Sequence, residues 1–161
     1  MRPARAADAP ELAALSGALN NPRWSNEYLA LEHRVNALRE ILQAAGPPGV
    51  GLTWLVATEP GKSKAVGFSV GSIDAQIGIR VCEVSVEEAH RRAGIGRTLL
   101  LALLGALAGE HLPAELEVTE DNVPARRLYE SLGFTASRST ALPNGAPALV
   151  MRRPPAPLRG A

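Results

Sequence analysis

The chain has 161 residues, 46% of them hydrophobic, which suits one folded domain with a core and is too short for two domains of ordinary size. A net charge of +1 at pH 7 argues against a strongly electrostatic nucleic-acid binder, so no nucleic acid is expected as a partner. We expect a cytoplasmic protein without a membrane partner, because the chain has a single cysteine, no apolar signal-peptide core at its N-terminus and no apolar run of the roughly 20 residues that span a bilayer.

The first third of the chain predicts an edge strand and two helices. The strand covers residues 1–7, and Asp8 is expected to cap a helix that ends at Asn20-Asn21-Pro22. A second helix is expected over residues 26–45, because apolar side chains recur there at helical spacing. Its buried stripe should consist of Leu31, Val35, Leu38, Ile41 and Leu42.

The middle of the chain predicts three consecutive strands and a crossover. Residues 52–58, 65–73 and 79–86 are rich in β-branched side chains and are separated by short turns, so they should pair antiparallel. A leucine-rich helix over residues 94–110 then leads to a strand over residues 115–119. Because a helix separates them, this strand should run parallel to the one before the helix.

The last third predicts one more helix and two short strands. The helix starts near Asn122 and stops at Gly133, and the strands cover residues 134–137 and 148–152. The whole order is β-α-α-β-β-β-α-β-α-β-β, which predicts a mixed sheet with helices on both faces. A single domain over residues 1–153 is expected, followed by a loose tail over residues 154–161.

The junction between the third strand and the leucine-rich helix predicts an anion site. Two glycines, Gly94 and Gly96, allow a tight turn and close approach of a ligand to the backbone. The first amides of a helix have no internal partners and carry the positive end of its dipole, and three arginines flank this turn. A phosphate or pyrophosphate is the natural ligand, although a plain strand–helix turn has the same composition.

Two motifs in this order carry a resemblance to a known family. The first is Arg91-Arg92-Ala93-Gly94-Ile95-Gly96, which has the form Arg/Gln-x-x-Gly-x-Gly/Ala at a strand–loop–helix junction. The second combines Asn122, Ala125, Leu128-Tyr129 and Gly133-Phe134 at matching spacing. With both motifs at the right separation, the chain resembles the GNAT superfamily of acyl-CoA-dependent N-acetyltransferases. The first third of the chain matches by layout only.

This resemblance implies both a fold and an activity. The fold is the GNAT acyltransferase fold of the α/β (α+β) class. It has a mixed, mostly antiparallel sheet of six to seven strands, a central splayed parallel pair and about four flanking helices. The activity is transfer of an acetyl group from acetyl-CoA to a primary amine of a small molecule or peptide N-terminus. The amine attacks directly in a ternary complex, and no metal takes part. The acceptor, the acyl chain length of the donor and a homodimer are left open.

The resemblance also implies how acetyl-CoA binds. The amides of residues 92–97 hold the pyrophosphate, and the strand backbone of residues 84–86 pairs with the pantetheine arm like an added strand. The next strand must splay away to admit the arm. Asn122 offers its amide to the arm and can cap its helix at the same time. The implied cofactor-binding set is Val84, Ser85, Val86, Arg91, Arg92, Ala93, Gly94, Ile95, Gly96, Arg97, Thr98, Asn122 and Ala125.

Two residues are implied in catalysis. Tyr129 would lie beside the sulfur and act as the general acid that protonates the departing thiolate. Glu83 would take the proton of the amine, directly or through water, although a solvated or ion-paired strand glutamate is an equal alternative. Glu27, Glu32 and His33 are weaker candidates for the base, and Cys82 is interpreted as core filling.

The acceptor would lie between the first two helices and the late hairpin, near residues 20–33 and 141–146. Trp24 and Tyr28 suit an apolar slot, and Glu27 and Glu32 suit a cationic amine, although ordinary helix packing and solvated charge explain each of the four, taken singly, better. The substrate-binding candidates are Trp24, Glu27, Tyr28 and Glu32.

Two other functions compete with catalysis. A non-catalytic acyl-CoA sensor of the same fold would keep the glycine turn. A nucleotide-binding module is disfavoured, because no Gly-Lys-Ser/Thr follows the glycines and no acidic ribose contact lies about 20 residues further on in a βαβ unit.

Overall fold

The computed structural model describes residues 1–16, 31–46, 49–107, 111–142 and 145–155, with only the backbone given for residues 31–34. Its strands are β1 (Arg2–Pro3), β2 (Thr53–Thr58), β3 (Ala65–Asp74), β4 (Gly78–Val86), β5 (Ala114–Thr119), β6 (Thr135–Ala141) and β7 (Pro147–Arg153). The helices are α1 (Ala9–Leu15), α2 (Leu31–Ala44), α3 (Ile95–Leu107) and α4 (Val123–Glu130). Short 3-10 turns, η1 (Ala6–Asp8) and η3 (Glu88–His90), precede α1 and α3.

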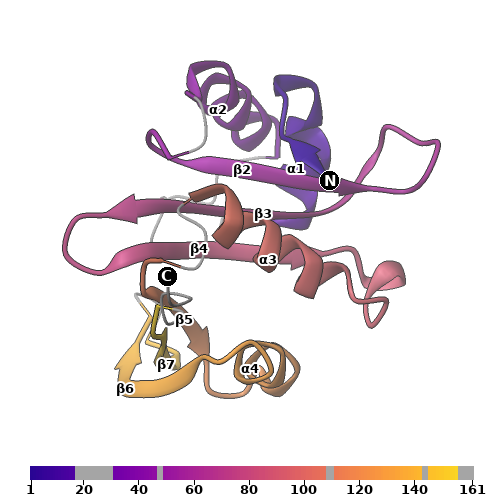
Figure 1. Ribbon diagram of the computed structural model, residues 1–161. Coiled ribbons are helices and arrows are strands. Elements are labelled where there is room, and N and C mark those ends of the chain that lie inside the picture. Colours follow the sequence, from indigo (N-terminus) through magenta and orange to yellow (C-terminus); the bar gives the residue numbers. More distant parts are fainter. Residues whose placement is uncertain (17–30, 47–48, 108–110, 143–144, 156–161) are drawn as a thin grey trace, which may run out of the picture.

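The strands form one sheet in the order β1-β2-β3-β4-β5-β7-β6. Every neighbouring pair is antiparallel except β4 and β5, which are parallel because α3 connects them. The predicted element order and the mixed sheet with one central parallel pair are therefore confirmed. In Figure 1, β2, β3 and β4 form the upper part of the sheet, and β5, β6 and β7 lie below them with α4.

Helices cover both faces of the sheet. On one face α1 and α2 pack against β2 and β3, in a cluster that includes Leu12, Leu38, Val56 and Phe68. On the other face α3 lies across β3 and β4 (Figure 1), and its leucines form the largest core cluster with β4, β5 and α4. The helices of the described residues are all too short or too polar to cross a membrane.

Glycine on β3 brings α3 close to the sheet. A Cβ atom at Gly71 would lie 3.2 Å from Leu103 Cδ2 and 2.6 Å from the carbonyl oxygen of Arg80 on β4. A side chain at this position would therefore push away both the helix and the neighbouring strand. The missing side chain therefore lets both α3 and β4, whose ends form the site described below, approach β3 closely.

Several boundaries differ from the predictions for the first third. Strand β1 has two residues instead of seven, because the backbone turns into η1. The Asp8 carboxylate does not cap α1; it accepts hydrogen bonds from the Arg2 guanidinium at 2.7 and 2.8 Å and from the Arg5 amide at 2.7 Å. These contacts hold the pKa of Asp8 below its usual value despite the cost of burial. Helix α1 ends at Leu15, where Ser16 turns extended, and not at residues 20–22.

One member of the predicted stripe of α2 is exposed. Leu38 and Leu42 are buried, but 37% of Ile41 is exposed. Leu38 and Leu42 lie one turn apart and face the sheet, whereas Ile41 falls to one side of the line they define. Strands β6 and β7 are also longer than the predicted residues 134–137 and 148–152, because they pair with each other along six residue pairs.

Candidate functional site

The parallel strands β4 and β5 separate halfway along their length. They pair at Ile79↔Ala114, Arg80↔Glu115 and Val81↔Leu116, and no further. Strand β4 then continues to Val86 beside β3, and β5 continues to Thr119 beside β7. The splayed parallel pair predicted from the sequence is therefore present, with the site at the diverging ends.

A β-bulge on β4 marks the point of separation. Val81 pairs with Gly71 and Glu83 pairs with Val70, so Cys82 is an extra residue on β4. As a result Cys82 and Glu83 both lie on the face of α1. Cys82 packs against the α1–α2 cluster, and Glu83 contacts the end of α1.

Val84 and Val86 consequently lie on the opposite face, against α3. Sequence reasoning missed the bulge, although a signal was present. The apolar positions of the strand change phase, from Ile79 and Val81 to Val84 and Val86. Continuous alternation would have kept the four side chains in one phase.

The diverging end of β4 has backbone groups that point away from its neighbour β3. The Glu87 amide donates to the Val66 carbonyl on the β3 side at 2.8 Å. Because hydrogen-bonding direction alternates along an antiparallel pair, the main-chain groups of Val84 and Val86 point toward the side that β5 has left. The Val86 carbonyl accepts a hydrogen bond from Arg91 Nε at 3.1 Å. The predicted backbone stretch 84–86 thus lies at the divergence.

The turn before α3 has a backbone suited to anion binding. Arg92 has a φ of 61° and Gly94 a φ of 79°, so the chain bends sharply before the helix. The Thr98 amide and hydroxyl both bond to the Gly94 carbonyl, at 3.0 and 3.1 Å. The amides of residues 92–97 find no acceptor among the described residues. Six donors at the positive end of α3 thus remain available to a ligand.

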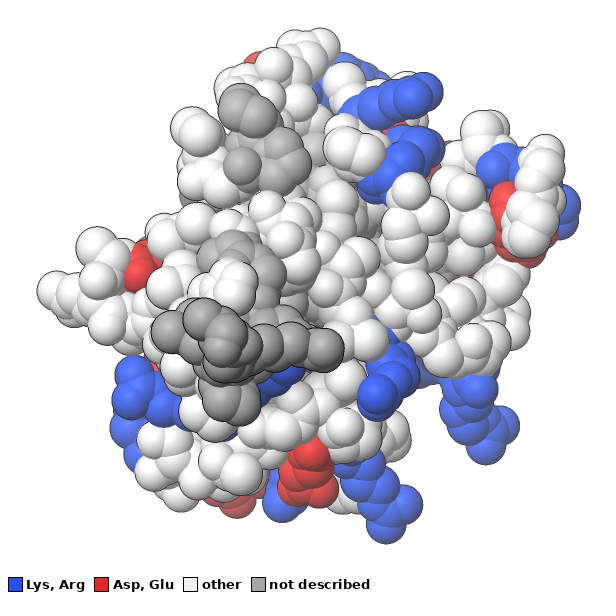
Figure 2. All heavy atoms as spheres, in the orientation of Figure 1, with Lys and Arg blue, Asp and Glu red and all other residues white. Residues whose placement is uncertain are grey.

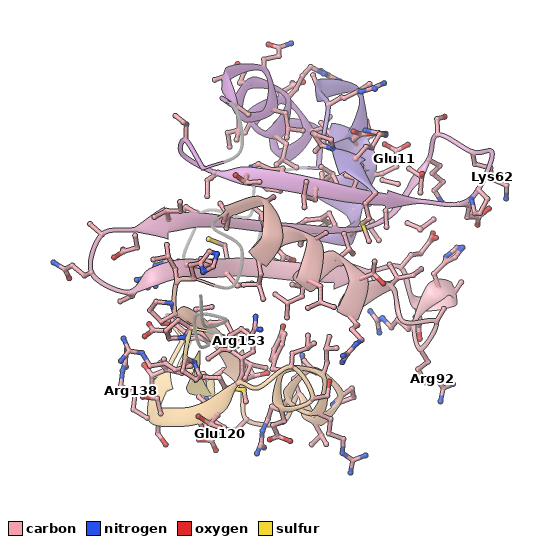
Figure 3. All side chains as sticks on the ribbon, in the orientation of Figure 1. Glu11, Lys62, Arg92, Glu120, Arg138 and Arg153 are labelled. Carbon is pink, nitrogen blue, oxygen red and sulfur yellow. The ribbon has the colours of Figure 1, made fainter. Side chains whose placement is uncertain are left out.

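The arginines of this turn lie at the surface. Arg91, Arg92 and Arg97 are all exposed, and Figure 3 shows Arg92 extending away from the fold. Arg97 donates to the Ser131 hydroxyl at 3.2 Å and so joins α3 to the end of α4. Figure 2 shows Lys and Arg side chains around this end of the molecule and along its lower edge near α4. The turn therefore combines free amides with nearby positive charge.

Helix α4 begins next to the same turn. Asn122 caps it, with Oδ1 accepting from the Ala125 amide at 3.2 Å, which confirms the predicted cap. A Cβ atom on Gly96 would lie 3.4 Å from Leu128 Cδ2 and 3.8 Å from Val86 Cγ2. Gly96 therefore stands where α3, α4 and the end of β4 meet.

Tyr129 and Glu83 approach the divergence from α4 and β4. Tyr129 is 8% exposed, and its ring lies 6.0 Å from that of Phe134. Burial, and to a lesser degree the negative charge of Glu83, raises the pKa of Tyr129 to about 12. Glu83 Oε2 accepts a hydrogen bond from the Ser16 hydroxyl at 2.8 Å. The charge of Glu83 thus acts on the Tyr129 phenol, and Ser16, which no sequence motif indicated, bonds directly to Glu83.

The predicted acceptor residues are not described. Trp24, Glu27 and Tyr28 lie outside the described residues, and Glu32 belongs to α2 with only its backbone given. The described part of the hairpin segment 141–146 connects β6 to β7.

Comparison with known proteins gives consistent matches. The model of the acetyltransferase (GNAT) family matches residues 18–134. A mycothiol acetyltransferase of Brachybacterium faecium is 33% identical over 132 residues, covering 81% of this chain and 34% of that protein. A mycothiol acetyltransferase of Thermomonospora curvata is 51% identical over 53 residues, covering 32% of this chain and 18% of that protein. The chain thus spans about a third of the length of the first relative and less of the second.

Solved structures give the same fold. Ard1 from Thermoplasma volcanium superimposes with a TM-score of 0.68 at 25% identity, over 94% of each chain. The putative acetyltransferase yncA from Salmonella typhimurium, solved with its cofactor acetyl-CoA, superimposes with a TM-score of 0.66 at 20% identity, over 99% of this chain and 95% of that one. The second likeness concerns the fold alone. These matches confirm the resemblance and the fold predicted from the sequence.

Proposed function

Because the chain belongs to the acetyltransferase (GNAT) family, we propose that it moves an acetyl group from acetyl-CoA to a primary amine, by direct attack in a ternary complex. The observation that carries this proposal is the row of six amides at residues 92–97, which have no acceptor among the described residues and lie beside the diverging backbone of β4. A long ligand with a pyrophosphate at one end and amides along its arm matches that combination.

The chain's own groups divide the binding of acetyl-CoA between them. The amides of residues 92–97 hold the pyrophosphate, with Arg91, Arg92 and Arg97 adding positive charge. The main-chain groups of Val84 and Val86 pair with the pantetheine arm in the space that β5 leaves. Other members of the predicted set support this geometry through their own hydrogen bonds. The Ser85 hydroxyl donates to the Leu15 carbonyl at the end of α1, and the Thr98 hydroxyl donates to the Gly94 carbonyl at the start of α3. The Ala125 amide donates to Asn122 Oδ1, which caps α4.

Glu83 is the base in this proposal. Its carboxylate lies at the bulge, one residue before the stretch that pairs with the arm, so a bound thioester carbon would be near it. An amine is protonated at neutral pH, and it attacks only after losing a proton. Glu83 accepts that proton, directly or through a water molecule.

Tyr129 assists the leaving group. When bound, acetyl-CoA supplies a thioester whose C–S bond breaks as the C–N bond forms, and the sulfur leaves as a thiolate. With a pKa near 12, the phenol stays protonated throughout the neutral range. It therefore stays a hydrogen-bond donor to the sulfur. As the C–S bond breaks, its proton passes to the departing thiolate, and the tyrosinate regains a proton from solvent, without the help of a metal.

The acceptor is a primary amine of a small molecule or peptide. The relatives named mycothiol acetyltransferase favour a small-molecule amine, and Trp24, Glu27, Tyr28 and Glu32 remain the predicted contacts. A single domain over residues 1–153 and a cytoplasmic location remain predictions, and a homodimer is left open.

The deciding experiment is a screen of amines with acetyl-CoA. The purified chain is incubated with acetyl-CoA and a panel of small amines, amino sugars and peptides, and free thiol is read with a chromogenic disulfide. Mass spectrometry then checks that the amine has gained an acetyl group. CoA binding by calorimetry without acetylation of any amine would favour the acyl-CoA sensor instead.

A further inference from the structure

Two hydrogen bonds that involve serine side chains join the end of α1 to β4. The Ser16 hydroxyl donates to Glu83 Oε2 at 2.8 Å, and the Ser85 hydroxyl donates to the Leu15 carbonyl at 2.7 Å. The Ser16 amide also bonds to the Leu12 carbonyl at 2.9 Å. Ser16 is 2% exposed, so both its backbone amide and its side-chain hydroxyl are buried and hydrogen-bonded.

We propose that Ser16 is the positioning residue for Glu83, whose carboxylate it holds toward the acceptor amine. This inference rests on the proposed function, because it assumes that Glu83 is the base. It adds a residue 67 positions away in sequence that belongs to neither family motif quoted above.

The physical reason lies in the glutamate side chain. The terminal torsion of glutamate is broad and has no sharp staggered minimum, so the carboxylate plane is poorly defined by its own rotamer. A short hydrogen bond to one oxygen defines that plane and so directs the other oxygen. A buried donor also loses little to competition from water, which strengthens a bond to a charged acceptor.

The bulge on β4 makes this contact available. Without the extra residue Cys82, side chains beyond Val81 would alternate in the other phase, and Glu83 would face α3. With it, Glu83 faces the end of α1, where Ser16 leaves the helix with an extended ψ of 113°. The bulge on β4 and the end of α1, which are far apart in sequence, together allow the hydrogen bond between Ser16 and Glu83.

Other titratable groups lie on the elements next to Glu83. From the described residues, α4 presents Tyr129, whose pKa the charge of Glu83 helps to raise. On β4 the neighbour is Cys82, and on β5 the side chain following the last paired residue is Glu117. A tyrosine that stays neutral, a thiol and a second carboxylate do not favour the ionised form of Glu83. The hydrogen bond from Ser16 favours the ionised form and so helps to keep the base ready to accept a proton.

The test is Ser16→Ala, with two readouts. The first is a carbon-13 NMR titration of the Glu83 carboxyl in the full chain without ligand, assigned with Glu83→Gln. The second is the dependence of kcat/KM on pH with acetyl-CoA and an accepted amine. Loss of a hydrogen bond to the charged form should move the Glu83 titration, and the acidic limb with it, to higher pH by roughly one to two units. The KM for acetyl-CoA should stay within about twofold, because Ser16 ends α1 on one face of the sheet and α3 packs on the other.

Ser69→Ala is the matched control. Ser69 is also fully buried, and its hydroxyl donates to a backbone carbonyl, that of Leu99, at 3.2 Å. Its removal should cost stability without moving the acidic limb. Ser16→Cys covers the case in which alanine unfolds the chain, because it keeps the shape with a much weaker donor. It should move both readouts in the same direction as alanine.

The outcomes separate this inference from the proposed function. If Glu83→Gln removes the acidic limb while Ser16→Ala and Ser16→Cys leave both readouts at wild-type values, Ser16 only packs and the inference is overturned. If Glu83→Gln keeps the limb, Glu83 is not the base, and the role of Ser16 is overturned with it. If the wild type acetylates no amine, the proposed function itself fails.

Discussion

Replacing Tyr129 with phenylalanine removes one hydroxyl and keeps the ring. The ring packs against Phe134 with centroids 6.0 Å apart, so Tyr129→Phe should preserve the core around α4. The hydroxyl is the group that we propose to protonate the departing thiolate. Its loss should lower the single-turnover rate of acetyl transfer by about 10²–10⁴-fold. CoA affinity should stay within about twofold, because the α3 turn and β4 are untouched.

The raised pKa of Tyr129 adds a prediction about pH. A phenol of ordinary pKa 10.0 would begin to ionise near pH 9, but this one has a pKa of about 12. The rate of acetyl transfer by the wild type should therefore show no basic limb from Tyr129 between pH 8 and about pH 10.

Stability gives an independent measure of the same group. A folded pKa above the unfolded value means that the folded state favours the neutral phenol. The corresponding stability is fully present below about pH 10 and is lost as pH rises toward 12. A shift of about two units corresponds to about 3 kcal/mol at full loss. The difference in unfolding free energy between wild type and Tyr129→Phe should change by this order across the window.

The assays are rapid-quench acetyl transfer at saturating acetyl-CoA and denaturant unfolding from pH 8 to 12. A mutant with the wild-type rate would show that water or another group protonates the sulfur. If the unfolding free energies of the two proteins changed in parallel with pH, the phenol would ionise at its ordinary pKa and would not be desolvated in the folded state.

Three further predictions follow from the site and the core. Glu83→Gln keeps the shape of the side chain and removes the base, so the acidic limb of kcat/KM against pH should flatten. An unchanged profile would mean that Glu83 has a structural role only. Gly96→Asp places a negative charge among the amides of residues 92–97 and should weaken CoA binding by about tenfold or more in calorimetry. Gly96→Ala should weaken it much less, because its Cβ would meet only side-chain atoms, Leu128 Cδ2 at 3.4 Å and Val86 Cγ2 at 3.8 Å. Equal losses for the two variants would attribute the effect to steric crowding. Gly71→Ala would put a Cβ 2.6 Å from the Arg80 carbonyl and should destabilise the fold by about 1–3 kcal/mol in denaturant unfolding, and a neutral effect would mean that β3 and β4 can shift apart freely.

Local patterns in the sequence were sufficient for the element order and for the family motifs. The turn around Gly94 and the cap at Asn122 depend on short-range backbone geometry, and they are found as predicted. The parallel pairing of β4 and β5 also follows from local information, because a helix between two strands of one sheet forces a crossover.

Only the tertiary structure decided which residues lie against each face of β4. The bulge at Cys82 depends on the partner strand β3, where Gly71 and Val70 set the register, and this places Glu83 next to Ser16. The same holds for Asp8, whose carboxylate binds Arg2 instead of capping α1. A side chain with one strong partner within reach takes it, and the identity of that partner depends on how distant segments pack. For Glu83 one such partner, Ser16, lies 67 residues away, beyond the reach of any periodic pattern within a single element.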